Sequence, residues 1–315
     1  MRMRTLQLAK AGVALLLAVA IRPLFAQQTP ARTVQPGGIP LDRETSSPPD
    51  SALASTEARL RASLEQNPQS AGTLYELALI LRQENKPRES IETYNRAAQM
   101  RKPDATQLRS VALDYVLLDD YDDAVHWLRV ALGVEPNNVD VLYSLGRCLY
   151  TQNRFSDARK VYLRLLALDP KNLKAEENLG LTYDAENDPQ KAEEALRTAA
   201  KWAEERDLKD PWPYLDFGIF FLDQSRGADA QPFLEKAAEL DAKSALAHEK
   251  LGMALVDNGD SGRGIQELQL AVGLAPNDPK AHFELGRAYR VAGQLDKARA
   301  ESEISKSLYG SHSQN

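Results

Sequence analysis

The chain has 315 residues, of which 43% are hydrophobic, and its net charge of −6 makes it acidic. Such a surface repels phosphate groups, so the composition disfavours nucleic acid as a partner. A single cysteine excludes an internal disulfide, and no segment after the first residues is long and apolar enough to span a membrane.

Residues 1–26 predict a secretory signal peptide. Arg2, Arg4 and Lys10 precede an apolar run from Ala11 to Ile21, which is too short to span a bilayer and has the length of a signal's apolar region. We expect cleavage after Ala26, and an uncleaved membrane anchor is the alternative. Removal of these residues takes away four positive charges and leaves a net charge of −10. The segment predicts a periplasmic or secreted protein of a bacterial envelope.

Residues 27–50 predict a Pro-rich, disordered linker. They hold five prolines and two glycines with few apolar residues. A segment of this composition cannot bury enough apolar surface to fold by itself. It would let the rest of the chain stand off from an envelope surface if the leader stays uncut.

Residues 51–310 are organised by a repeat of about 34 residues. An apolar residue followed by glycine recurs, with spacings of 34, 38, 34 and 34 residues, at Gly146, Gly180, Gly218, Gly252 and Gly286. Twelve residues after each glycine stands a small residue, at Ala158, Ala192, Ala230, Gly264 and Ala298. The frame also runs back through Ala112 and Ala78 to an incomplete copy, of which only the second half is present and contains Leu60. A fixed period of this length indicates a repeat array.

Each copy has the pattern of a helix hairpin. From Val139, apolar residues recur at helical spacing in two stretches, and a polar turn separates them. Gly146 and Ala158 would let the two helix backbones approach closely. Pro170 ends the second helix, because proline has no N–H to donate and clashes with the preceding turn. Since one hairpin cannot bury its apolar face alone, its neighbours must stack on it.

These copies resemble tetratricopeptide repeats, whose pattern is an aromatic residue, Leu-Gly, a tyrosine, a small residue, an aromatic residue and a closing proline. The last copy shows it with His282, Leu285-Gly286, Tyr289 and Ala298. Seven copies begin near Ala71, Ala105, Val139, Leu173, Pro211, Ala245 and Pro279. A four-residue insertion in the fourth copy affects only the packing angle to the fifth. The resemblance implies an all-α, right-handed superhelical solenoid of about seven hairpins, with an extra N-terminal helix and a disordered tail at residues 311–315.

In this family the first helix of each pair lines a concave groove, so the resemblance implies where a partner binds. The groove residues that it implies are Tyr75, Arg82, Arg109, Tyr143, Arg147, Tyr150, Trp212, Ile219, Met253, Phe283, Arg287 and Arg290. These side chains are unusually apolar and aromatic for positions that the hairpin core does not need, which favours a partner site. The alternative is that several of them pack between neighbouring copies.

Cys148, His248 and His282 are expected to be packing residues. Cys148 has no histidine within 20 residues in sequence, and a reactive thiol needs a neighbouring cation or base. The histidines occupy the slot that the family fills with an aromatic residue, and "HEKLG" puts Gly252 where a zinc motif would have its second histidine. We therefore expect no metal, no cofactor and no catalytic residue.

The sequence favours a non-enzymatic, exported scaffold that captures a protein or peptide segment in its groove, in the assembly of envelope complexes. One alternative is an enzyme or metal-dependent protein with a site between copies, around His248, His282 and Glu249. Another is a self-associating structural spacer. Nucleic acid is not an expected partner, and a membrane is one only if the leader is kept.

Overall fold

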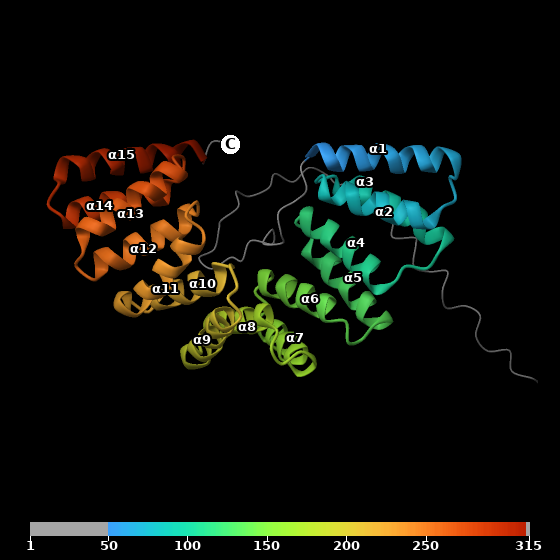
Figure 1. The fold of residues 1–315 in the computed structure, drawn as a ribbon, viewed down its shortest axis with the longest axis horizontal. Coiled ribbons are helices and arrows are strands. Elements are labelled where there is room, and N and C mark those ends of the chain that lie inside the picture. Colours follow the sequence, from blue (N-terminus) through green and yellow to red (C-terminus); the bar gives the residue numbers. More distant parts are fainter. Residues whose placement is uncertain (1–49, 313–315) are drawn as a thin grey trace, which may run out of the picture. The chain divides into compact units, whose positions relative to one another are not determined.

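The computed structural model describes residues 50–312, and every element in that range is a helix (Figure 1). The predicted signal peptide, the predicted linker up to residue 49 and residues 313–315 lie outside the described range. The described chain forms two compact units, one that ends at Pro103 and one that begins at Asp104.

The first unit contains α1 (Asp50–Gln66), α2 (Ala71–Gln83) and α3 (Pro87–Met100). Helix α2 packs against α3 to form a hairpin, and α1 packs against α2. Leu60 of α1 is buried against Leu77 and Leu81 of α2. The extra N-terminal helix that was predicted is therefore α1, and it covers the open side of the first hairpin.

An ion-pair cluster also holds α1 on this hairpin. Lys86, at the turn between α2 and α3, donates to Glu57 of α1 over 2.9 Å and to Glu84 over 2.7 Å. Arg61 lies 2.6 Å from the same Glu57 carboxylate. The bond from Lys86 is the main cause that lowers the pKa of Glu57 to about 2, and Glu84 and Arg61 contribute.

We expect Glu57→Gln to weaken the packing of α1 on the hairpin at neutral pH by about 1 kcal/mol, because it removes the charge that pairs with Lys86 and Arg61. The effect is this small because both cations are partly exposed and solvent screens them. The folded pKa of Glu57 lies below its ordinary value of 4.5. The contribution of Glu57 to the stability of α1 is therefore present above pH 4.5 and is lost as the pH falls toward about 2. Hydrogen exchange of the α1 amides at neutral and acid pH measures this. If the variant lost α1 protection in acid as steeply as the parent chain does, the assignment to Glu57 would be wrong.

The second unit contains six hairpins. Their helices are α4 (Ala105–Leu117), α5 (Tyr121–Val134), α6 (Val139–Thr151), α7 (Phe155–Leu168), α8 (Leu173–Ala185), α9 (Pro189–Glu205), α10 (Trp212–Asp223), α11 (Gly227–Leu240), α12 (Ala245–Asp257), α13 (Ser261–Leu274), α14 (Pro279–Val291) and α15 (Leu295–His312). Each even-numbered helix packs against the odd-numbered helix that follows it, and that helix packs against the next hairpin (Figure 1). With the first unit, seven hairpins and one extra helix are present in residues 50–312, and the predicted all-α repeat fold is confirmed.

Two details differ from the sequence expectation. Helix α15 runs to His312, so residues 311 and 312 are helical where a disordered tail was predicted. The insertion in the fourth copy lengthens α9 to 17 residues, whereas the second helix of the third copy has 14. It then adds a short loop in which Asp207 has a positive φ of 48°.

Local chemistry explains where the helices begin and turn. Each first helix except α10 is preceded by a serine, asparagine or aspartate whose side chain accepts a backbone N–H of the first turn, namely Ser70, Asp104, Asn138, Asn172, Ser244 and Asp278. The turn inside each hairpin has one left-handed residue, at Asn85, Asp119, Asn153, Asn187, Ser225, Gly259 and Gly293. Asparagine, aspartate and glycine tolerate this conformation best.

The repeated small residues stand where two helices meet. Gly146 of α6 faces the ring of Tyr162 on α7, which is fully buried. In the first hairpin, Ser90 of α3 donates to the Ala78 carbonyl of α2 over 2.8 Å. The two small-residue slots of the repeat therefore fix how closely the helices of a hairpin approach, as the sequence predicted.

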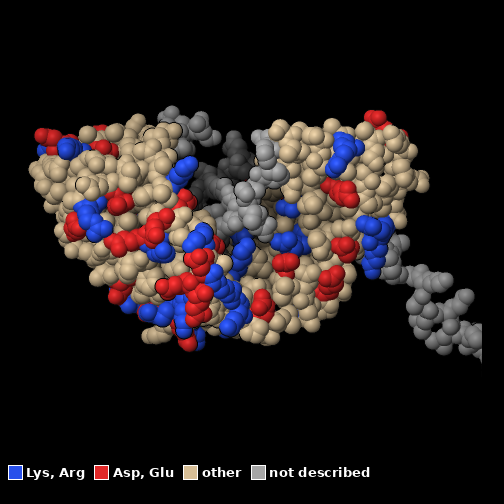
Figure 2. All heavy atoms as spheres, in the orientation of Figure 1, with Lys and Arg blue, Asp and Glu red and all other residues tan. Residues whose placement is uncertain are grey.

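The outer surface is mixed in charge. Acidic and basic side chains lie interspersed over α7 to α9 on the face shown in Figure 2. Exposed pairs such as Arg197–Glu193 and Lys191–Asp188, at 2.6 and 2.7 Å, contribute to this pattern. Within residues 50–312 no helix has the length and hydropathy that a membrane span needs.

Candidate functional site

Within each unit, the candidate surface consists of three slots on the first helices of its hairpins, and we call these slots the A face. Counted from the glycine or alanine of each first helix, the slots lie three residues before, one after and four after it. Residues at these spacings share one face of a helix. All but one of the predicted groove residues occupy these slots, and Trp212 begins α10 one turn earlier.

In the first unit the A face is largely closed by packing. Tyr75 is 5% exposed, its hydroxyl donates to the Arg101 carbonyl over 2.6 Å, and its ring lies 5.5 Å from that of Tyr94. Arg82 is half-buried, and Leu79 between them is partly exposed. Tyr75 therefore serves mainly to hold α2 against α3.

In the second to fourth copies, α4, α6 and α8 bring an aromatic ring and cations together. The guanidinium of Arg147 lies 5.7 Å from the centroid of the half-buried Tyr143 ring, and the Lys174 ammonium lies 5.9 Å from it. Arg109 of α4 donates to the Ser144 hydroxyl over 2.7 Å, which ties α4 to α6. Tyr143 thus lies within a cationic neighbourhood, although Arg147 itself is only 5% exposed.

Tyr150 closes the same face of α6. Its ring is half-buried and lies 5.3 Å from the ring of Phe155, at the start of α7. This edge-on contact stabilises the turn of the third hairpin. The sequence analysis placed Tyr143, Arg147 and Tyr150 together in the implied groove. The structure joins Tyr143 to Arg147 and gives Tyr150 a separate aromatic neighbour.

The fourth and fifth copies combine apolar side chains with acidic ones. Trp212, Ile219 and Leu222 are half-buried and pack against the core of α9 to α12. Burial raises the pKa of Asp184 at the end of α8, and the charge of Asp223 on α10 raises it further. Burial also raises the pKa of Asp223, against the opposing charge of Lys250. Asp184 lies in the last slot of the A face and Asp223 one position beyond it, and their negative charges would favour a cationic group of a ligand over an anionic one.

The last two copies leave the most apolar surface open. Phe283 of α14 is 55% exposed, and Met253 of α12 is half-buried. Arg287 donates to Asp257 and Glu284 over 3.0 and 2.7 Å, while Arg290 is exposed. Phe283 therefore lies on a helix face that also carries two arginines, one engaged in ion pairs and one at the surface.

The chemistry of the remaining candidates is that of packing residues. Cys148 is 1% exposed, and burial raises the pKa of its thiol to about 12, so it stays protonated near neutral pH. His248 and His282 are 8% and 5% exposed, and each is hydrogen-bonded inside its own hairpin. No cluster of three or more metal-ligating side chains occurs within residues 50–312.

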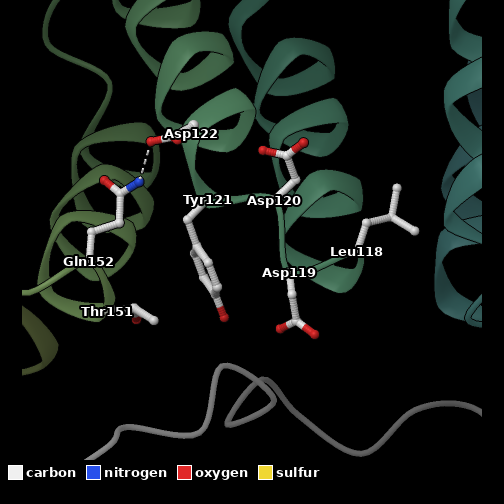
Figure 3. A pocket seen from close by; sticks show the side chains of 7 residues that line it. All are labelled: Leu118, Asp119, Asp120, Tyr121, Asp122, Thr151 and Gln152. Atoms are coloured by element: carbon white, nitrogen blue, oxygen red, sulfur yellow. Dashed lines mark hydrogen bonds between the residues drawn. The ribbon is translucent and has the colours of Figure 1, made fainter. Parts of the chain in front are cut away.

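A shallow pocket lies where the turn between α4 and α5 meets the end of α6. Its lining residues are Leu118, Asp119, Asp120, Tyr121, Asp122, Thr151 and Gln152 (Figure 3). Asp120 accepts the Asp123 N–H that begins α5, and Asp122 accepts from Gln152 over 2.8 Å. Asp119 and Tyr121 point to the opposite side of the loop (Figure 3). Two of the carboxylates are thus engaged in holding the turn and joining it to α6.

Comparison with known families identifies the repeat. Models described as the tetratricopeptide repeat match residues 55–105, 116–176, 177–206, 215–279 and 250–303, which together make up well over half of the chain. The chain is a tetratricopeptide repeat protein. Repeats of this family are usually non-catalytic and serve as scaffolds for protein–protein interaction, and the family commonly binds protein or peptide partners.

Solved structures show the same tetratricopeptide fold. A tetratricopeptide repeat protein from Parabacteroides merdae is 18% identical, with a TM-score of 0.61 over 76% of this chain and 93% of that one. A chain of the Cut9–Hcn1 hetero-tetramer is 17% identical, with a TM-score of 0.63 over 76% of this chain and 46% of that one. At this identity the likeness shows the fold alone.

One relative of this tetratricopeptide repeat protein is named as an enzyme. A barley protein named as the probable peptide N-acetylglucosaminyltransferase SPINDLY is 26% identical over 170 residues, or 52% of this chain. The chain spans only 18% of that relative's length. The match lies in the repeats, so no transferase activity follows from it.

Several features of the tetratricopeptide surface were missed from the sequence. Two contacts join neighbouring copies: Lys174 lies over the Tyr143 ring, and Ser144 accepts from Arg109. Lys174 and Ser144 were missed because they lie outside the three slots. Asp184 is in the last of these slots and Asp223 follows it by one position in the next copy, so the 34-residue frame could have placed them near each other. The signal was available once the copies were aligned.

Proposed function

We propose that this protein is an exported, non-catalytic scaffold that holds a segment of a partner protein on the A face. Membership of the tetratricopeptide repeat family supports the scaffold role. The fold is also similar to that of a chain in the Cut9–Hcn1 hetero-tetramer, an assembly of two kinds of chain. The groove of the first helices is where we place the partner.

The observation that carries the proposal is the exposure of Phe283. In the same slot of other copies, Leu215 is 1% and Glu249 is 4% exposed, whereas Phe283 is 55% exposed. Exposed aromatic surface beside charged groups is typical of a partner site. Phe283 would bury its ring under an apolar side chain of the partner, and Arg290 would meet a polar or acidic group beside it.

Export rests on the leader. Its basic start and short apolar run support removal near Ala26 and a location in the bacterial envelope, where the scaffold would assist the assembly of a complex. N-terminal sequencing of the mature chain tests this. A mature protein that starts at Met1 in the cytoplasm would contradict it.

The alternative of an enzyme between copies draws no support from its named residues. Glu249 is paired with Lys250 over 2.7 Å, and each histidine is bonded within its own hairpin. A hydrolase or metal-dependent assay on the mature chain distinguishes the two functions. Turnover that is lost in His248→Ala with the fold intact would favour the enzyme.

We expect photo-crosslinking to separate the A face from the outer surface. A photoreactive residue at position 283 should capture a defined envelope protein. The same residue in place of Leu270, which is 51% exposed on the second helix α13, should not. With the captured partner purified, Phe283→Ala should weaken binding at least fivefold, or by more than about 1 kcal/mol. Leu270→Ala should leave binding unchanged.

Melting of the same variants completes this experiment. Both side chains are largely exposed, so neither substitution should move the melting temperature by much. If Phe283→Ala and Leu270→Ala bind the partner as well as the parent chain, the A face is not the binding site. If Phe283→Ala lowers affinity and stability together, Phe283 acts through the fold.

A further inference from the structure

Two neighbouring hairpins carry the same buried histidine–glutamate pair. His248 Nδ1 of α12 lies 2.7 Å from Glu267 Oε2 of α13, and its Nε2 lies 3.2 Å from the Ala242 carbonyl oxygen. His282 Nδ1 of α14 lies 2.7 Å from Glu301 Oε2 of α15, and its Nε2 lies 3.0 Å from the Pro276 carbonyl oxygen. The same geometry in two copies indicates a repeated device and not a chance contact.

The pair is specific to these two copies. In the fifth copy the same two positions hold Tyr214 and Phe233, and in the third they hold Leu142 and Val161. The side chains at these positions in the third and fifth copies pack in the hydrophobic core, and this packing does not depend on a titratable proton. The last two hairpins therefore have an interaction between ionisable groups where those copies have apolar packing.

The geometry sets how many protons each pair must hold. A carbonyl oxygen can only accept, so Nε2 must carry a hydrogen that it donates to the turn. The Nδ1–Oε2 contact at 2.7 Å also needs a hydrogen between its two atoms, and this length is typical of a charge-assisted bond. If that hydrogen is lost, a ring lone pair faces an acceptor oxygen at one of the two contacts.

We infer that His248–Glu267 and His282–Glu301 are proton-dependent clasps that close the last two hairpins. Each clasp joins three pieces of the chain: the turn before the hairpin, its first helix and its second helix. Histidine exchanges its proton between about pH 5 and 8. The direction of the pH effect follows from the number of hydrogens that each pair must hold. Each clasp is closed while its pair holds both hydrogens, and it opens when one of them is lost as the pH rises.

Charged groups flank both pairs. Around His248, α13 contributes Glu267 and, next to it, Arg263, whose charge interacts with Glu267. The turn before α12 contributes Asp241, which accepts the Lys243 N–H.

Around His282, α15 contributes Glu301, and the turn before α14 contributes Asp278, which accepts the Lys280 N–H. Both nitrogens of each ring thus face an acceptor oxygen, a carboxylate at Nδ1 and a backbone carbonyl at Nε2. A proton released by either pair would leave one of these contacts unmade.

The test measures hydrogen exchange of the full chain at about pH 6 and about pH 8, corrected for the intrinsic rate of each amide. We expect the opening constant of α14–α15 to rise about tenfold at the higher pH, the effect of one lost buried hydrogen bond. Helices α12–α13 should show a similar rise. Helices α6–α7, with Leu142 and Val161 at the two positions, should show none.

A matched variant copies the fifth hairpin into the seventh. His282→Tyr with Glu301→Phe places there the residues that stand at the two positions in the fifth copy, Tyr214 and Phe233, and it should remove the pH response of α14–α15 only. Nitrogen NMR of the parent chain checks the proton count without any substitution. Both ring nitrogens of His248 and His282 should carry hydrogens at about pH 6.

Three outcomes would overturn the inference. The first is a neutral ring signature for both histidines at about pH 6. The second is an opening constant of α12–α15 that does not change with pH. The third is a pH response of α14–α15 that persists in the double variant.

Discussion

Phe217→Ala is expected to destabilise the chain by about 3–5 kcal/mol, the usual cost of removing a fully buried phenylalanine. Phe217 of α10 is 0% exposed, and its ring centroid lies 4.5 Å from the rings of both Phe221 and Phe233. The last of these is on α11, so the ring joins the two helices of the fifth hairpin. Chemical denaturation of the purified chain measures the loss.

The unfolding should also lose cooperativity. In a repeat array each copy is stabilised by its neighbours only, so a weak fifth copy separates those on either side of it. We expect hydrogen exchange to speed up first in α10 and α11. Phe283→Ala is the control, because that ring is 55% exposed and should cost little. A loss below about 1 kcal/mol in Phe217→Ala would show that the hairpin closes around the cavity.

The period of the sequence was sufficient to predict the fold. Small residues at Gly146 and Ala158, with apolar residues at helical spacing around them, require two helices that touch, and the structure has them. The turn chemistry carried a second signal that was not used. Asn85, Asn153 and Asn187 recur in the frame because each hairpin turn needs one left-handed residue. Ser225 breaks this pattern, and so only the backbone reveals its conformation.

Exposure on the A face could not be predicted from the frame. Tyr75 and Phe283 occupy the same slot, yet they are 5% and 55% exposed. Tyr75 has Tyr94 of α3 and the carbonyl of Arg101, just after α3, beside it. Phe283 belongs to the last first helix among the described elements, and no later hairpin packs on it. A periodic pattern gives the direction of a side chain but not the atoms that cover it.

The histidines show the same division. Their slot predicted packing, and both are buried. The sequence alone did not pair them with Glu267 and Glu301, since those residues stand 19 positions later on another helix. Aligning the copies on both slots at once reveals the substitution of an apolar pair by an ionisable one. Such paired departures from a repeat pattern are where a chain-specific property is best sought.

The close approach of helices gives a second large effect, in Gly146→Leu. A Cβ atom at this position would lie 2.5 Å from Cε1 of Tyr162 and 2.6 Å from its Cζ. The Tyr162 ring is fully buried. We expect a loss of about 1–3 kcal/mol from overpacking, because the third hairpin must open to admit the side chain. Thermal melting and hydrogen exchange of α6–α7 measure it.

Gly133→Ala provides the control for this prediction. No atom lies within 4 Å of a Cβ placed at Gly133 of α5, so alanine there should be neutral or should stabilise the helix by up to about 1 kcal/mol. Both substitutions enlarge a helical glycine, and they differ in whether another helix is in the way. Loss of protection in Gly146→Leu should be greatest in α6–α7 and weaker in α10–α13, since copies support one another only through direct contact. An unchanged melting curve in Gly146→Leu would mean that Tyr162 can leave its place at no cost, and that the small-residue slots do not set the spacing of the hairpin.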